Sequence, residues 1–152
     1  MDRKKLQIEQ LDRKLKRFKD AVQVPQPEIG WLKTIRISLG MSLQQVADKL
    51  SITKQSVQEI ETREKDGTIT INSLKETADA LDMRLIYGLV PKDGTLDDLI
   101  DRKAKELALR IVSRTSNTMK LEDQENSKER LQKAVEERKA AIKNEMPKSL
   151  WD

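Results

Sequence analysis

A stretch of 21 residues, "MSLQQVADKLSITKQSVQEIE" (residues 41–61), constrains the fold more than any other part of the chain. Ser42 and Thr53 each precede a short run of apolar residues at helical spacing, where a hydroxyl can cap the first backbone amides of a helix. The inward positions of the two runs are Val46, Ala47, Leu50, Val57 and Ile60. Only two residues separate the runs, so the helices must cross closely, and the small side chain of Ala47 suits that crossing.

Two short helices with so tight a connection form the helix-turn-helix pattern. In the second helix, the positions opposite the inward ones are polar, and they are Lys54, Gln55, Gln58 and Thr62. When such a helix lies in the major groove of DNA, its exposed polar side chains face the edges of the bases. The pattern therefore predicts a surface for reading DNA.

The segment from Arg36 to Glu61, "RISLGMSLQQVADKLSITKQSVQEIE", resembles the XRE family of helix-turn-helix proteins, which includes the phage repressors. The longer segment "GTITINSLKETADALDMRLIYGLVP", the later "TMKLEDQ" and the terminal "LWD" resemble a narrower family, mobile mystery protein A. The resemblance implies a lambda-repressor-like fold and a DNA-binding transcription regulator, with repression of its own operon as the expected role. In the narrower family the gene typically lies beside one for a Fic-domain protein, which implies an antitoxin.

The resemblance also implies which residues read the bases of a palindromic operator in double-stranded DNA. They are Thr53, Lys54, Gln55, Ser56 and Glu59, with Gln58 alongside. Gln55 can pair with adenine, Lys54 with guanine and Glu59 with the amino group of cytosine. Ser42, Gln44 and Thr62 lie at helix ends, where we expect them to contact phosphates and fix the position of the protein on DNA.

Two further positions are expected to be structural. Phage repressors pair the positions of Arg36 and Glu61 as a partly buried ion pair, which ties the first helix of the domain to the recognition helix. The chain departs from its families at Ser51, where glycine is usual, and at Leu43, where phage repressors carry glutamine. Strain or a changed shape is expected at Ser51, because a glycine adopts left-handed backbone angles more easily.

Prolines and changes of apolar pattern divide the chain into three segments. We expect a basic amphipathic helical arm over residues 1–24, the helix-turn-helix domain with a terminal strand over residues 26–92, and a helical extension over residues 93–152. The expected fold class is thus mainly α, with a lambda-repressor-like domain, a short β-strand and helical extensions at both ends. Trp31, beside Leu32, is expected in the core.

The arm carries the charge imbalance of the chain. The net charge is +4, and residues 1–20 hold eight basic and four acidic residues, while the remaining 22 Lys/Arg and 22 Asp/Glu cancel. Its apolar residues recur at steps of three and four, at Ile8, Leu11, Leu15, Phe18 and Val22. Three alternatives follow: a short coiled coil, a helix packed on its own domain, or a basic clamp on DNA phosphates.

The stretch "MRLIYGLVP" (residues 83–91) has the alternation of a β-strand. It can pair with "TITI" (residues 68–71) or with the same strand of a second copy, and we favour the second, which makes the protein a homodimer. The residues expected at that dimer interface are Leu85, Ile86, Tyr87 and Leu89.

Beyond the strand, Thr95 with Asp97 and Asp98 predicts the start of a long helix. The polar run of residues 113–127 is expected to interrupt it, and a last helix is expected over residues 128–144. Thr118 to Glu122 nearly matches the inhibitory motif of Fic antitoxins, although Asp123 stands where glycine or asparagine is usual. Direct inhibition of a Fic-domain partner by the C-terminal helices is therefore the alternative function.

The composition argues against an enzyme. The chain has no cysteine and no histidine, so thiol chemistry, the commonest general base and the commonest zinc ligands are missing. No glycine-rich phosphate loop or nucleophile motif is present, and we expect neither metal nor cofactor. No signal peptide or membrane span is recognisable, which favours a cytoplasmic protein.

Overall fold

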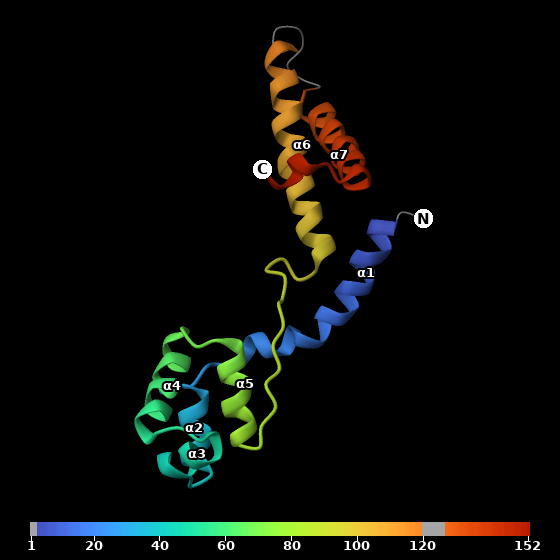
Figure 1. Ribbon diagram of the computed structural model, residues 1–152. Helices are drawn as coiled ribbons and strands as arrows, with labels where there is room; N and C mark the ends of the chain where they lie inside the picture. The colour runs from blue at the N-terminus through green and yellow to red at the C-terminus, as the bar shows by residue number, and fades with distance from the viewer. Residues whose placement is uncertain (1–2, 120–126) are drawn as a thin grey trace. The chain divides into compact units, whose positions relative to one another are not determined.

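The computed structural model describes residues 3–119 and 127–152, and every regular element among them is helical (Figure 1). The elements are α1 (Arg3–Leu15), the 3-10 helix η1 (Lys16–Gln23), α2 (Trp31–Ser38), α3 (Leu43–Leu50), α4 (Lys54–Asp66), α5 (Ile71–Ala80), α6 (Leu96–Met119), α7 (Ser127–Glu145) and the 3-10 helix η2 (Lys148–Trp151). The mainly helical class expected from the sequence is confirmed. No helix among the described residues is long and apolar enough to cross a membrane.

The chain forms two compact units. The four-helix unit is residues 20–88 and holds α2 to α5, while the α6–α7 unit combines residues 1–19 with residues 89–152. The basic arm therefore groups with the C-terminal helices, and α1 contacts α6 within that unit. The first helix of the arm therefore packs against its own chain, but on α6 of the C-terminal extension rather than on the helix-turn-helix domain.

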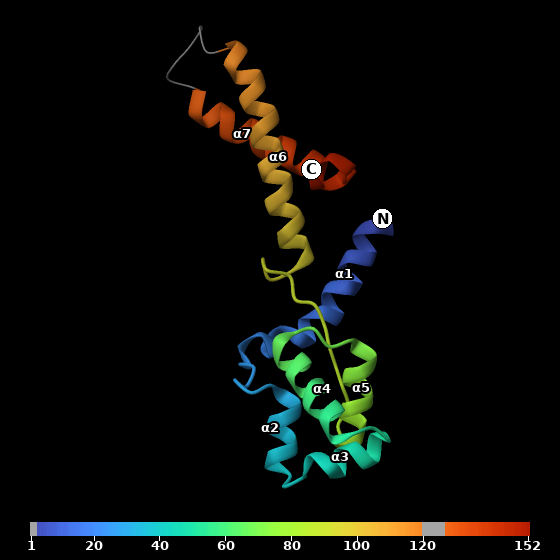
Figure 2. The ribbon, with the colours of Figure 1, turned by 60° about the vertical axis from the view of Figure 1, so that its left-hand side comes forward.

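The four-helix unit closes around one apolar cluster. Its buried members are Leu32, Val46, Ala47, Val57 and Leu81, and they come from all of its helices except α5, with Leu81 directly after α5. Ala47 has no exposed surface, which fits a small residue where α3 and α4 pack closely. Helices α3 and α4 lie next to each other in both views (Figures 1 and 2).

Short-range signals set the ends of α3, α4 and α5. The side chains of Ser42, Thr53 and Thr70 each accept a hydrogen bond from the backbone amide three residues later. Ser51 ends α3 in the left-handed conformation, with φ 55° and ψ 43°. That conformation is costly for a residue with a Cβ atom, so the strain expected at this departure from the family pattern has a geometric basis.

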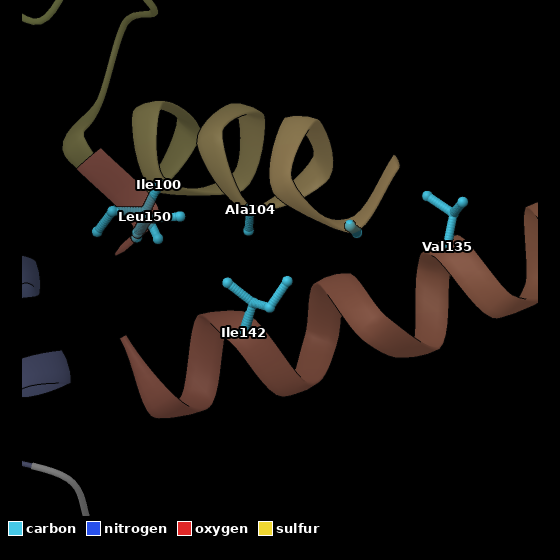
Figure 3. Packing of buried hydrophobic residues seen from close by; sticks show 6 residues of the cluster. Ile100, Ala104, Val135, Ile142 and Leu150 are labelled. Atoms are coloured by element: carbon cyan, nitrogen blue, oxygen red, sulfur yellow. The ribbon is translucent and has the colours of Figure 1, made fainter. Parts of the chain in front are cut away.

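The α6–α7 unit has its own core, which Figure 3 shows from close by. Helices α6 and α7 run side by side in opposite directions, and Leu150 of η2 packs onto α6. The buried residues are Ile100, Ala104, Ala108, Val135, Ile142 and Leu150. Two alanines at a spacing of four on α6 give that helix a narrow face, against which α7 packs closely.

Asp12 of α1 holds the first turn of α6. Its carboxylate accepts hydrogen bonds from the backbone amides of Leu96 at 2.8 Å and Asp97 at 3.3 Å. Thr95 accepts a further one from the Asp98 amide at 3.0 Å, as expected of a cap. α6 then runs on to Met119, so the expected interruption from residue 113 is wrong.

The β-strand expected over residues 83–91 does not form within the chain. The described part of the chain contains no strand, and no hydrogen bond there involves the backbone of residues 84–90. The expected partner segment, residues 68–71, does not form a strand either, because Thr70 caps α5 and Ile71 is the first residue of that helix. The expectation for Trp31 is also wrong, since its side chain is exposed while Leu32 beside it is buried.

Candidate nucleic-acid interface

The candidate recognition face is the exposed side of α4. Val57, Glu61 and Glu64 are buried on the opposite side and fix how the helix is turned. The structure places the following predicted site residues on the exposed side: Thr53, Lys54, Gln55, Gln58, Glu59 and Thr62. Ser56 is half-buried. These residues therefore lie on one continuous face of α4, and this face begins at the first turn of the helix, next to the Thr53 cap.

Some polar side chains of this face already have hydrogen-bond or ion-pair partners within the protein, and others do not. Within the described residues, the ends of Lys54 and Gln55 have no hydrogen-bond or ion-pair partner, so they are available to bases. Glu59 lies 3.6 Å from Arg63 on the next turn. The hydroxyl of Thr62 donates to the Gln58 carbonyl at 3.0 Å, as helix-internal threonines often do.

Thr53 and Ser56 serve the helix itself. Thr53 Oγ1 accepts from the Ser56 amide at 3.1 Å, and the two hydroxyl oxygens lie 2.8 Å apart. Such a cap satisfies an amide that would otherwise lack a partner in the first turn. These two residues thus position the start of the recognition helix, whatever else they contact.

The start of α3 carries the other predicted contacts, Ser42 and Gln44. Ser42 Oγ accepts from the Gln45 amide at 3.1 Å, and the Gln45 side chain accepts from the Ser42 amide at 2.8 Å. Gln44 donates to the Asp48 carboxylate at 2.8 Å, so a phosphate contact would require it to exchange that partner. Gln45 is missing from the sequence prediction, although serine followed three residues later by glutamine is the signature of a capping box.

Arg36 and Glu61 meet in the interior, 25 residues apart in sequence. The guanidinium donates from Nε to Glu61 Oε2 at 2.8 Å and from Nη2 to Oε1 at 3.1 Å. Nη1 donates to the Met41 carbonyl at 3.1 Å. One side chain therefore ties α2, the turn before α3 and the recognition helix together, and bidentate geometry holds their relative angle.

Glu64 is a second buried carboxylate of α4 that the sequence did not reveal. Its Oε1 accepts from the Leu32 amide at 2.7 Å, and its Oε2 accepts from the Gln26 side chain at 3.3 Å. It caps α2, because Gly30 at the N-cap has no side chain to do so. Gly30 has φ 87°, and a Cβ there would lie 3.1 Å from Glu64 Oε2, so both conformation and space favour glycine.

The four-helix unit is acidic rather than basic. Residues 20–88 contain eight Lys/Arg and ten Asp/Glu, a net charge of −2. A DNA-binding surface on this unit must therefore rely on local geometry around Lys54 and the helix N-termini rather than on overall charge.

Comparison with known proteins decides the domain type. The sequence model of a helix-turn-helix family matches residues 32–87. The α2–α5 segment is a helix-turn-helix domain. No curated protein matches the chain, and no solved structure does. The match supports a DNA-binding transcription regulator. In helix-turn-helix domains the second helix of the motif is the recognition helix, and α4 holds that position here.

Proposed function

We propose that the protein is a sequence-specific, dimeric regulator that binds a palindromic operator and represses its own operon. The observation that carries the proposal is the face of α4, where Lys54 and Gln55 extend from the first turn without partners in the described chain. Both side chains suit base edges in the major groove, each such pair contributing about 1–3 kcal/mol of discrimination.

The backbone around this face supports a rigid reader. The Arg36–Glu61 pair and the buried Val57 fix the rotation of α4 about its own axis, and the Thr53 cap fixes the residue at which the helix starts. Side chains held by packing and capped helices present their polar ends in a defined geometry. Ser42, Gln44 and Thr62 supply the phosphate contacts in this proposal, with Gln44 leaving Asp48 on binding.

A second copy supplies the other half-site, and the segment of residues 83–90 is our proposed seam. Leu85 is half-buried, whereas Ile86, Tyr87 and Leu89 are 73%, 65% and 82% exposed. Backbone without partners beside exposed apolar side chains is a template for pairing with another strand. Two copies paired about a two-fold axis present two recognition helices for half-sites about 34 Å apart.

The test of base reading is the double substitution Lys54→Ala with Gln55→Ala. We expect it to abolish discrimination between the operator and a scrambled duplex, with an unchanged melting temperature, because neither side chain packs in the core. The matched control is Gln23→Ala with Lys33→Ala, which removes the same two residue types from exposed positions outside α3 and α4. Operator discrimination that survives the first pair refutes the recognition face.

The proposed seam is tested by placing a charged side chain at its centre. Leu85→Asp or Tyr87→Asp should yield monomers in analytical ultracentrifugation and should weaken operator binding, since a buried unpaired carboxylate opposes pairing. Val22→Asp, also at an exposed apolar position, is the control and should leave the dimer intact. Soluble dimers of unchanged operator affinity would overturn the seam.

We further propose a Fic-domain protein as a partner, on the strength of the resemblance to mobile mystery protein A. On the C-terminal helices of the α6–α7 unit, Leu109 and Trp151 are large apolar side chains that are exposed, and such side chains suit a protein contact. The motif from Thr118 to Glu122 extends beyond the described residues, because residues 120–126, which include Glu122, are not described. Co-expression with a Fic-domain protein from the same genome, followed by affinity capture, tests the partner, and the absence of a complex refutes it.

A further inference from the structure

The junction of α1 and η1 carries a dense basic cluster. The sequence "RKLKRFK" places five cations among seven residues, and they are Arg13, Lys14, Lys16, Arg17 and Lys19. All five side chains are exposed. Between them, Leu15 and Phe18 are half-buried, so the helical backbone is held on one side while the cations surround it on the others.

These cations are not neutralised within the described residues, where no ion pair involves any of them. Other basic residues of the same unit are paired: Arg102 with Asp93 at 2.8 Å, and Lys143 with Asp101 at 3.2 Å. The preceding acid, Asp12, is engaged by the amides at the start of α6. The cluster therefore presents five uncompensated charges on about two turns of helix.

We propose that this basic cluster binds the phosphodiester backbone of DNA beside the operator. The proposal rests on the proposed function, and its motive is that the helix-turn-helix unit has a net charge of −2, so the overall charge of that unit does not attract DNA. Lysine and arginine near phosphates release condensed counterions, and this term is independent of base sequence. The cluster contributes affinity, and α4 contributes discrimination.

The covalent connection limits which phosphates the cluster reaches. Residues 20–30 join Lys19 to Trp31, the first residue of α2. A link of this length spans at most about 40 Å when fully extended. That distance is close to one turn of DNA, about 34 Å, so the phosphates in question are those directly flanking the half-site.

The experiment compares salt dependence in the full-length protein. The cluster variant replaces the five cations with glutamine, which retains helix propensity. The control variant makes the same change of five charges at exposed residues of α6 and α7, namely Lys105, Arg110, Arg114, Lys128 and Lys133. Circular dichroism must show the same helix content in all three proteins. The probe is a duplex selected by the wild-type protein from a random-sequence pool, with a scrambled duplex beside it.

Each cation that contacts a phosphate contributes about 0.9 to the slope of log affinity against log salt. We expect the slope of the cluster variant to be shallower than that of the wild type by about 2 or more. Between 50 and 200 mM salt, the factor by which affinity falls should then be at least about tenfold smaller in the variant than in the wild type. Its ratio of operator to scrambled affinity should stay unchanged. A smaller change in slope, or an equal change in the control variant, overturns the proposal.

The two proposals fail in different ways. If the wild-type protein binds the selected and scrambled duplexes equally, sequence-specific regulation is wrong, while the slopes on the scrambled duplex still test the cluster. Vesicles of phosphatidylserine and phosphatidylcholine provide the comparison with a membrane surface. Loss of vesicle binding in the cluster variant with an unchanged slope on DNA assigns the cations to a lipid surface and overturns the proposal.

Discussion

Substitution of Arg36 by alanine tests the central brace of the helix-turn-helix domain. The change removes three hydrogen bonds, two to Glu61 and one to the Met41 carbonyl. The Glu61 side chain is 7% exposed, so its carboxylate would be left without a partner in a place that water reaches poorly. We therefore expect a loss of folding stability rather than a direct loss of DNA contacts.

The structure bounds the size of the loss. Removal of one partner from a buried ion pair costs about 3–5 kcal/mol, because the desolvation of the remaining charge is no longer offset. A unit of 69 residues (20–88) has a total stability of about 3–10 kcal/mol at ordinary values per residue. At the middle of this range the variant keeps about 2–4 kcal/mol and remains folded at 25 °C, whereas at the lower end it lies close to its unfolding midpoint.

The two tryptophans allow the units to be measured separately. Trp31 lies in the four-helix unit and Trp151 in the α6–α7 unit, so a Trp151→Phe background makes fluorescence report the first alone. In urea, a loss of 3–5 kcal/mol moves the midpoint down by about 2–4 M. Operator affinity, measured where the variant is still folded, should equal that of the wild type.

The control is the double substitution Arg36→Met with Glu61→Leu. Replacement of both charges by apolar side chains of similar size removes the stranded carboxylate and should recover most of the lost stability. A cost below about 1 kcal/mol for Arg36→Ala would refute the brace, since this is the range of exposed ion pairs. Equal losses in the single and double variants would refute the stranded charge as the cause.

Three further predictions concern single positions. Ser51→Gly should stabilise the helix-turn-helix domain by about 0.5–1 kcal/mol, seen as a higher urea midpoint, because φ 55° is costly for serine. Asp12→Ala should destabilise the α6–α7 unit by about 0.5–2 kcal/mol in urea titrations, because two amides of α6 lose their acceptor. A hydrogen bond from Arg102 lowers the pKa of Asp93 in the folded protein. The stabilisation that the ionised Asp93 provides is therefore complete above about pH 4 and is lost as the pH falls through the lowered pKa of the folded state. In a plot of stability against pH, Arg102→Gln should flatten this acidic part of the curve.

Local signals predicted the parts of the fold that local contacts determine. Ser42 and Thr53 cap α3 and α4 because their hydroxyls meet amides only three residues away. Ala47 is fully buried where the two helices pack, as the length of the connection required. Residues at helical spacing lie on one face regardless of the rest of the chain, so periodicity was sufficient for these elements.

Contacts between distant residues escaped the same reasoning. Glu64 caps a helix 32 residues earlier, and Asp12 caps one 84 residues later, so neither has a signature in its own neighbourhood. Trp31 was expected in the core because of its neighbour Leu32, but consecutive residues of a helix point about 100° apart, and Leu32 takes the inward position. α6 continues beyond residue 113, and within it the hydroxyl of Thr115 donates to the Ile111 carbonyl, so this polar residue fits inside a helix.

The segment of residues 83–90 fails for a different reason, because the hydrogen bonds that define a strand belong equally to its partner. Alternation placed Leu85, Tyr87 and Leu89 on one face, but it does not encode which chain buries that face. In the proposed seam, six such side chains from two copies contribute at most about 9–18 kcal/mol. Association costs about 4–15 kcal/mol, so the surplus is small. A seam of this strength makes the dimer dependent on protein concentration, and operator binding should then rise more steeply than a single-site curve as dimers form.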